Sequence, residues 1–170
     1  MVSVAVRRHD DAWAVAASVP DPELPMLTLA DLGILRDVEQ DGDRLAVTIT
    51  PTYSGCPAMR EIALDLRSRL AAAGYTDVQI RTQLDPPWSS DRITAEGRRK
   101  LARAGIAAPH PAPQHAGPVP LVLQPRRPAV TCPRCGSADT AQLSAFGATA
   151  CRALYRCDVC REPFEYVKEI

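Results

Sequence analysis

Histidine is scarce in this chain, and its scarcity limits the catalytic chemistry that the sequence can support. Only three of the 170 residues are histidine, and His110 and His115 fall within a Pro-rich stretch. A Cys/His dyad needs a base beside its thiol, so the sequence argues against a cysteine hydrolase. The G-x-S-x-G, G-x-G-x-x-G and Walker loops are also missing, and with them the signatures of serine hydrolases, dinucleotide enzymes and P-loop enzymes. Metal handling and partner binding remain as the function classes that the sequence supports.

The chain also lacks an excess charge of either sign and a long apolar run. Twenty basic side chains balance twenty acidic ones, so we expect no nucleic-acid partner. No stretch approaches a membrane span, and Arg7 and Arg8 interrupt the apolar start before a signal-peptide core could form. We therefore expect a cytoplasmic protein without a membrane partner. Thiols stay reduced in that compartment, so six cysteines indicate metal or redox chemistry before disulfides.

Proline and cysteine divide the chain into three parts. Residues 107–128 are rich in proline, a composition that removes amide donors and favours an extended backbone, so we predict a semi-rigid linker there. The region before it, residues 1–106, has one cysteine, and the region after it, residues 129–170, has five. The sequence therefore predicts two domains, 1–106 and 129–170.

The first domain carries the signals of an α+β fold, with a small antiparallel or mixed sheet packed with helices. Asp41 and Gly42 stand between the apolar patterns of 34–39 and 44–50, which predicts an antiparallel hairpin. The other predicted elements are helices at 11–18, 28–32, 57–74 and 94–104 and a strand at 78–84. The last helix carries a run of basic side chains that is typical of a solvated face: Arg98, Arg99, Lys100 and Arg103.

The second domain is predicted to be a small zinc-ribbon β domain with a four-cysteine metal site. It contains two Cys-x-x-Cys pairs, C-P-R-C-G at 132–136 and C-D-V-C at 157–160. Four such thiolates can surround one Zn²⁺ tetrahedrally, and the predicted ligands are Cys132, Cys135, Cys157 and Cys160. Closed coordination favours a structural zinc that supplies folding free energy to strands at 140–146, 152–155 and 164–167. Iron, in a rubredoxin-like site or a cluster, is the alternative for the same ligands.

Cys151 and Cys56 fall outside these pairs, and each has two interpretations. Cys151 is either a small buried hydrophobe of the ribbon hairpin or a labile fifth ligand. Cys56 lies in T-P-T-Y-S-G-C-P-A-M at 50–59, where Pro57 suits a first helical position and would place Cys56 at the N-cap. Amide donors and the helix dipole there would lower the pKa of the thiol and favour a reactive thiolate. A buried, inert cysteine is the alternative.

Four motifs, taken in order, resemble the metal-sulfur cluster biosynthesis family of small α+β proteins. They are D-P-E-L-P at 21–25, D-L-G-I-L at 31–35, T-P-T-Y-S-G-C-P-A-M at 50–59 and D-P-P-W at 85–88. With the Pro-rich linker, T-A-C-R-A-L-Y-R-C at 149–157 and the ribbon, the whole chain resembles the PaaD family, also called PaaJ, of bacterial phenylacetate degradation. The chain departs from that pattern at Arg92, where similar chains carry an aromatic residue.

The resemblance implies a non-catalytic accessory protein for the multicomponent monooxygenase that epoxidises phenylacetyl-CoA. Its implied partners are the oxygenase and reductase components of that epoxidase and iron–sulfur assembly proteins. Cys56 would be the functional thiol, holding iron or an iron–sulfur cluster transiently, alone or shared with a second copy in a homodimer.

Three acidic positions would accompany that thiol, Asp21, Glu23 and Asp31, for which capping and turn formation are the alternative roles. A structural component of the monooxygenase complex without metal delivery is the second hypothesis for the whole chain. A zinc-ribbon regulator that touches nucleic acid is the third, and the neutral charge balance argues against it.

Overall fold

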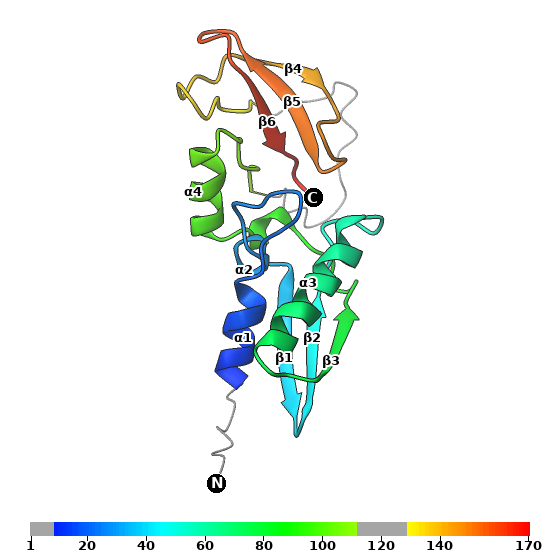
Figure 1. Cartoon of the computed structure of the whole chain (residues 1–170). Helices are drawn as coiled ribbons and strands as arrows, with labels where there is room; N and C mark the ends of the chain where they lie inside the picture. The colour runs from blue at the N-terminus through cyan, green and yellow to red at the C-terminus, as the bar shows by residue number, and fades with distance from the viewer. Residues whose placement is uncertain (1–8, 112–128) are drawn as a thin grey trace. The chain divides into compact units, whose positions relative to one another are not determined.

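The computed structural model describes residues 9–111 and 129–170, which fall into two compact units. Unit 1 is the described part of Met1–Trp88 together with Arg92–Gly97, and unit 2 is Ser89–Asp91 with the described part of Arg98–Ile170 (Figure 1). Most of the predicted linker, residues 112–128, lies outside the described residues. Within the described ranges, no helix combines the length and the apolar character that a membrane span requires.

The sheet of unit 1 is mixed and has three strands, β1 (Leu35–Asp41), β2 (Arg44–Ile49) and β3 (Asp77–Thr82). β1 pairs antiparallel with β2, and β2 pairs parallel with β3. Parallel neighbours need a crossover, which the helix between β2 and β3 supplies. The predicted Asp-Gly hairpin and the predicted α+β class with a mixed sheet are confirmed.

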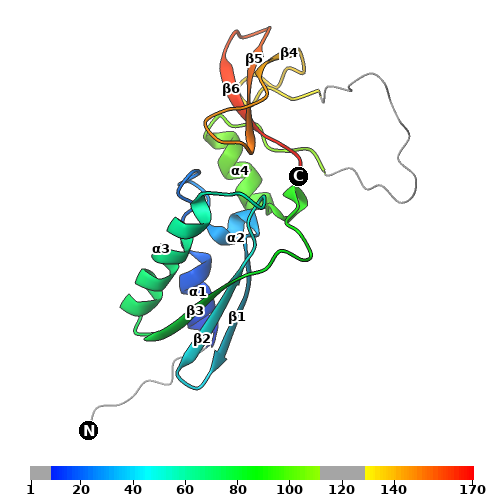
Figure 2. The ribbon, with the colours of Figure 1, turned by 90° about the vertical axis from the view of Figure 1, so that its right-hand side faces the viewer.

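Three helices of unit 1 are α1 (His9–Ala17), α2 (Leu29–Leu32) and α3 (Ala58–Ala72). α1 and α3 contact each other and cover one face of the sheet (Figure 2). α3 turns a stripe of side chains four residues apart toward the core, as an amphipathic helix does: Ala58, Ile62, Leu66 and Leu70 are all buried. Each predicted helix of this unit is present, with ends that differ from the prediction by one or two residues.

The segment after β3 packs onto α2. The indole of Trp88 is buried, and its Nε1 donates a hydrogen bond of 2.8 Å to the carbonyl of Leu32. The backbone amide of Thr94 donates to the carbonyl of Asp31 at 2.9 Å. Gly33, which ends α2 with a left-handed φ of 66°, lies so close to Arg92 that a Cβ would come within 2.7 Å of the Arg92 Cβ. The D-P-P-W motif is therefore an anchor of the fold.

Unit 2 contains the antiparallel sheet β4 (Thr140–Ser144), β5 (Arg152–Cys157) and β6 (Pro163–Val167), in that order. The strands enclose a small core of mostly apolar and aromatic residues: Ala107, Val130, Cys132, Ala153, Tyr155, Cys157, Phe164 and Tyr166. The small β domain that the Cys-x-x-Cys pairs predict is therefore present.

Both flanks of the Pro-rich stretch belong to this unit. Ala107 forms a parallel bridge with Tyr166 at the edge of the sheet, and the carbonyl of Val130 accepts a hydrogen bond of 2.7 Å from Thr140 Oγ1. The chain passes between the two units within residues 88–98, where α4 (Ala95–Arg103) begins in unit 1 and continues into unit 2.

The basic run on α4 is not a uniformly solvated face, and the prediction is wrong for Arg98. The guanidinium of Arg98 is half-buried in unit 2 and donates to the carbonyl of Pro109 at 2.5 Å and to that of Ser90 at 3.0 Å. Two carbonyl acceptors from separate segments use the fork of donors that arginine provides. Sequence spacing could not reveal them, because they lie eight and eleven residues away.

Candidate metal centre and the Cys56 site

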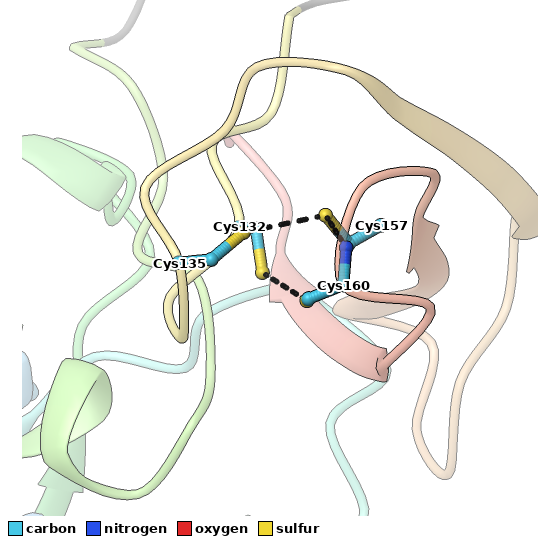
Figure 3. A group of neighbouring side chains, drawn as sticks. All are labelled: Cys132, Cys135, Cys157 and Cys160. Carbon is cyan, nitrogen blue, oxygen red and sulfur yellow. Dashed lines mark hydrogen bonds between the residues drawn. The ribbon is translucent and has the colours of Figure 1, made fainter.

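The four cysteines of the two Cys-x-x-Cys pairs lie together at one end of the ribbon. Their sulfurs are all within 4.8 Å of one another, and the side chains converge on a common point (Figure 3). Cys132 Sγ lies 3.8 Å from Cys160 Sγ, and Cys135 Sγ lies 3.5 Å from Cys157 Sγ. Cys132 and Cys157 are buried, whereas Cys135 and Cys160 are exposed. The structure thus brings together all four predicted ligands.

These distances fit a tetrahedral metal ion. Zn–S bonds of about 2.3 Å in a tetrahedron place the sulfurs about 3.8 Å apart, close to the 3.8 and 3.5 Å between the two sulfur pairs. Four thiolates suit zinc and iron alike, so the donor set leaves the identity of the metal open. Within the described ranges, this is the one group of three or more candidate ligands.

Each pair of cysteines forms a tight turn that is closed by hydrogen bonds. In the first turn, the amide of Gly136 donates to the carbonyl of Cys132 at 2.9 Å, and Gly136 has a φ of 75°. The equivalent residue after the second turn is Arg161, with a φ of 65°. A left-handed arginine is strained, because its Cβ approaches the backbone. The second turn therefore keeps the geometry of the first without its glycine.

Backbone amides are directed at the sulfur of Cys157. The amide of Cys160 lies 3.5 Å from that sulfur, and the amide of Val159 also donates to it. The hydrogen bond from the Cys160 amide is the largest influence on the pKa of Cys157. Together with the Val159 amide and the thiols of Cys135 and Cys160, it lowers that pKa to about 7 against the effect of burial. Cys157 can therefore offer a thiolate to a cation near neutral pH.

Cys151 lies outside this group of four sulfurs. It is half-buried just before β5, and its sulfur lies 3.0 Å from Thr149 Oγ1. The Thr149 hydroxyl gives this thiol a local hydrogen-bonding partner. Its roles as packed thiol or labile ligand both stay predictions.

Cys56 lies in the loop between β2 and α3, close to the start of the helix. Pro57 occupies the cap position with helical angles, and α3 begins at Ala58, one residue later than predicted. The thiol nevertheless accepts a hydrogen bond from the amide of Ala58, as a capping side chain would, and a second hydrogen bond joins it to the side chain of Thr52. Sequence analysis missed Thr52, although a hydroxyl four residues before the thiol in the same turn was a usable signal.

The predicted lowering of the Cys56 pKa is wrong in direction, because the pKa of this thiol is raised. Burial of the half-exposed thiol is the largest cause, and the charges of Glu23 and Asp21 act in the same direction. The hydrogen bonds from Ala58 and Thr52 favour the thiolate but do not outweigh burial. The fold therefore favours the protonated thiol over the thiolate at this place, and a nearby positive charge would act in the opposite direction.

The structure brings two of the three predicted acidic residues near that thiol. Glu23 and Asp21 are close enough for their charges to act on Cys56. Asp21 is buried, and its Oδ1 accepts hydrogen bonds from the amides of Glu23 at 2.9 Å and Leu24 at 2.8 Å. This carboxylate therefore also shapes the turn that carries Glu23.

Asp31, the third acidic residue, has a local structural role. It is the third residue of a capping box, in which its Oδ2 accepts from the amide of Thr28 at 2.9 Å and its own amide donates to Thr28 Oγ1 at 3.2 Å. A capping box satisfies two amides that the helix itself leaves without partners. The capping role that the sequence left open for Asp31 is thus present.

Two regions of the chain match two different families of known proteins. Residues 9–81, which include Cys56, match a family described as iron-sulfur cluster assembly protein. Residues 116–168, which include the four clustered cysteines, match a family described as PaaD zinc beta ribbon domain.

Two individual proteins show how far this similarity extends. A protein of Escherichia coli (strain K12), provisionally named as one subunit of 1,2-phenylacetyl-CoA epoxidase, is 44% identical over 168 residues, which are 99% of this chain and 97% of that protein. A crystal structure of a domain of unknown function, DUF59, from Bacillus anthracis has a TM-score of 0.51 at 27% identity and covers 55% of this chain and 90% of that one. The similarity to the Escherichia coli protein therefore extends over both units, whereas the similarity to the Bacillus anthracis domain extends over about half of the chain.

Proposed function

The chain belongs to the PaaD family, and on this basis we propose that it is a non-catalytic accessory protein of phenylacetyl-CoA epoxidase that helps to assemble a metal centre of that enzyme. The observation that carries the proposal is the similarity over 99% of the chain to a protein provisionally named as a subunit of the epoxidase. The match of residues 9–81 to an iron–sulfur assembly family supports the finer part, which is maturation. The expected partners are the oxygenase and reductase components and iron–sulfur assembly proteins.

In this proposal the ribbon is a structural zinc site. Cys132, Cys135, Cys157 and Cys160 would hold the ion, which supplies folding free energy to a sheet too small to be stable alone. Four protein ligands leave no open position for a substrate, so the ribbon serves as a rigid docking surface. The exposed Val159, at the tip of the second turn, is an apolar contact point for the client protein.

Cys56 is the proposed point of contact with the iron or cluster that is delivered. Its raised pKa keeps the thiol protonated until a cation arrives, and the carboxylates of Glu23 and Asp21 attract that cation. Binding then releases the thiol proton, as metal binding to cysteine does. One thiol is too few for a resident cluster, so the cargo is held transiently or between the Cys56 thiols of two copies.

A structural component of the epoxidase complex is the second candidate function. The half-buried, protonated state of Cys56 favours it, because a thiol of raised pKa is less reactive. This alternative predicts a stoichiometric complex with the oxygenase in which the thiol is dispensable. The maturation proposal predicts that the thiol is required and that the protein acts on many client molecules.

The test compares two matched cysteine variants in cells that express the epoxidase components. Cys56→Ser and Cys151→Ser each replace a half-buried thiol outside the group of four. We expect Cys56→Ser to lower the iron content and the specific activity of the purified client to the level found without this protein, and Cys151→Ser to leave both unchanged. Full iron loading and activity with Cys56→Ser would refute maturation through this thiol.

Metal analysis of the protein itself separates the two sites. After anaerobic purification, zinc is expected near one ion per chain in the wild type and in Cys56→Ser, as one site of four cysteines requires. Iron and acid-labile sulfide that appear in the wild type and disappear in Cys56→Ser would identify that thiol as a ligand. Zinc alone in both proteins would mean that Cys56 acts only on a metal held by a partner.

A further inference from the structure

Two side-chain polar atoms at the end of the unit 1 sheet are buried without a hydrogen-bonding partner. They are Nη1 of Arg36 and Oγ1 of Thr50, and neither atom has a partner among the described residues. Thr50 is only 1% exposed. A buried donor without a partner costs about 1–3 kcal/mol, which is why such groups are rare in native proteins. Arg36 lies on β1 and Thr50 directly follows β2, so one ligand that reached both atoms would satisfy them.

The register of the hairpin places both side chains on one face of the sheet. Leu35 pairs with Ile49 and Asp37 with Thr48, so Arg36 is the extra residue of a bulge opposite Thr48. Residues of a bulge share the face of the residue that they oppose. Thr50 follows Thr48 by two positions and therefore lies on the same face as Thr48 and Arg36.

A second arginine lies against this end of the sheet from another segment. Arg92 packs against Gly33, three residues before Arg36, at a distance that leaves no room for a Cβ on the glycine. Its charge also acts on Arg36, and together with burial, the larger cause, it lowers the pKa of that guanidinium. Neither arginine forms an ion pair with a carboxylate of the described residues. Two like charges are thus held near each other without a counter-ion from this part of the chain.

We propose that Arg36, Thr50 and Arg92 form a binding site for an oxyanion of the phosphate class. A phosphate dianion would balance the two positive charges and accept hydrogen bonds from the Arg36 fork and from the Thr50 hydroxyl. Two guanidiniums and a hydroxyl offer donors to three oxygens, whereas a carboxylate has only two. The site contains neither Cys56 nor the four clustered cysteines, so the test of this proposal does not depend on the proposed function.

The test is a titration of the zinc-loaded full chain with inorganic phosphate at constant ionic strength, followed by ¹H–¹⁵N NMR. We expect saturable shifts of the Arg36 Nε–H and Gly33 amide signals with phosphate and none with acetate. Coenzyme A, whose phosphates belong to the epoxidase substrate, serves as a second probe. Tighter binding of coenzyme A through the same signals would assign the phosphate to a cofactor ester, and equal or weaker binding to free phosphate.

Variants decide whether these residues form the site. Arg92→Gln changes an exposed side chain and should weaken phosphate binding about tenfold or more, the value of one charge-assisted hydrogen bond. Thr50→Val should weaken it severalfold. The matched control is Arg81→Gln on β3, whose guanidinium already pairs with Glu39 at 3.0 Å, and it should leave the affinity unchanged.

Three results would overturn the proposal. They are wild-type signals that do not shift with phosphate, an Arg81→Gln variant that loses as much affinity as Arg92→Gln, and a Thr50→Val variant with full affinity. The last result would assign the Thr50 hydroxyl to a bound water instead. Arg92→Gln provides the charge test without a large effect on folding, because the Arg92 side chain is exposed and not part of the core.

Discussion

Asp21 allows a direct test of what holds the turn beside Cys56. Its carboxylate is 6% exposed, and one oxygen accepts two backbone amides, those of Glu23 at 2.9 Å and Leu24 at 2.8 Å. A hydrogen bond to a charged acceptor contributes about 1.5–3 kcal/mol, and two that share one oxygen are not fully additive. We therefore expect Asp21→Ala to lower the free energy of unfolding of unit 1 by about 3 kcal/mol.

Asp21→Asn separates the hydrogen bonds from the charge. The amide oxygen of asparagine can accept the same two backbone N–H groups, but as a neutral acceptor, so we expect a loss of only about 1 kcal/mol. Asp43→Ala removes a carboxylate from an exposed turn residue and is the control, with an expected change within about 0.5 kcal/mol.

Tryptophan fluorescence during urea unfolding measures this effect in unit 1 alone. Both tryptophans of the chain, Trp13 and Trp88, belong to that unit, and Trp88 is only 4% exposed. The zinc-loaded protein should be used, so that the ribbon stays in one state. An Asp21→Ala loss below about 0.5 kcal/mol, or equal losses for Ala and Asn, would refute the reasoning from the two hydrogen bonds.

The same pair of variants connects the turn to the proposed function. If Asp21→Asn keeps most of the stability but lowers client iron loading, the negative charge itself acts near Cys56, as its influence on the pKa of that thiol suggests. If Asp21→Asn keeps both stability and client loading, Asp21 serves only to shape the turn.

Three further predictions concern the two thiol sites. Removal of the metal by a chelator should collapse the NMR amide dispersion of β4–β6 and leave the tryptophan fluorescence of unit 1 unchanged, and persistent dispersion in metal-free protein would contradict a metal-dependent ribbon. The rate of Cys56 alkylation, measured against pH, should have a midpoint above the ordinary thiol pKa. Glu23→Gln should lower that midpoint, because one of the charges that raise this pKa is gone. Because folding raises the Cys56 pKa, the stability that this group contributes is present below the pKa of the unfolded chain and is lost as pH rises through the pKa of the folded protein. Arg161→Gly should raise the stability of the ribbon by about 0.5–1 kcal/mol in thermal unfolding at fixed free zinc, since Arg161 has a φ of 65°, and a decrease would show that its side chain matters more than this strain.

Local signals in the sequence determined most of the secondary structure. Asp41 and Gly42 specify their hairpin, Thr28 and Gly33 delimit α2, and the four-residue spacing from Ile62 to Leu70 defines α3. These features depend on neighbours within a few residues, so periodicity and turn chemistry are sufficient to find them. The metal ligands follow the same rule, because each Cys-x-x-Cys turn prepares its own pair of sulfurs.

Tertiary structure decided the properties that depend on burial and on distant charges. Sequence reasoning placed Cys56 correctly near a helix start but gave its pKa the wrong direction. Desolvation and the carboxylates of a turn more than thirty residues earlier outweigh the hydrogen bonds from the Ala58 amide and the Thr52 side chain. The two carbonyls that Arg98 binds, and the shared face of Arg36 and Thr50, likewise follow from packing and strand register. Residue spacing fixes which groups a local turn presents, whereas the free energy of charging a group depends on everything that the fold brings around it.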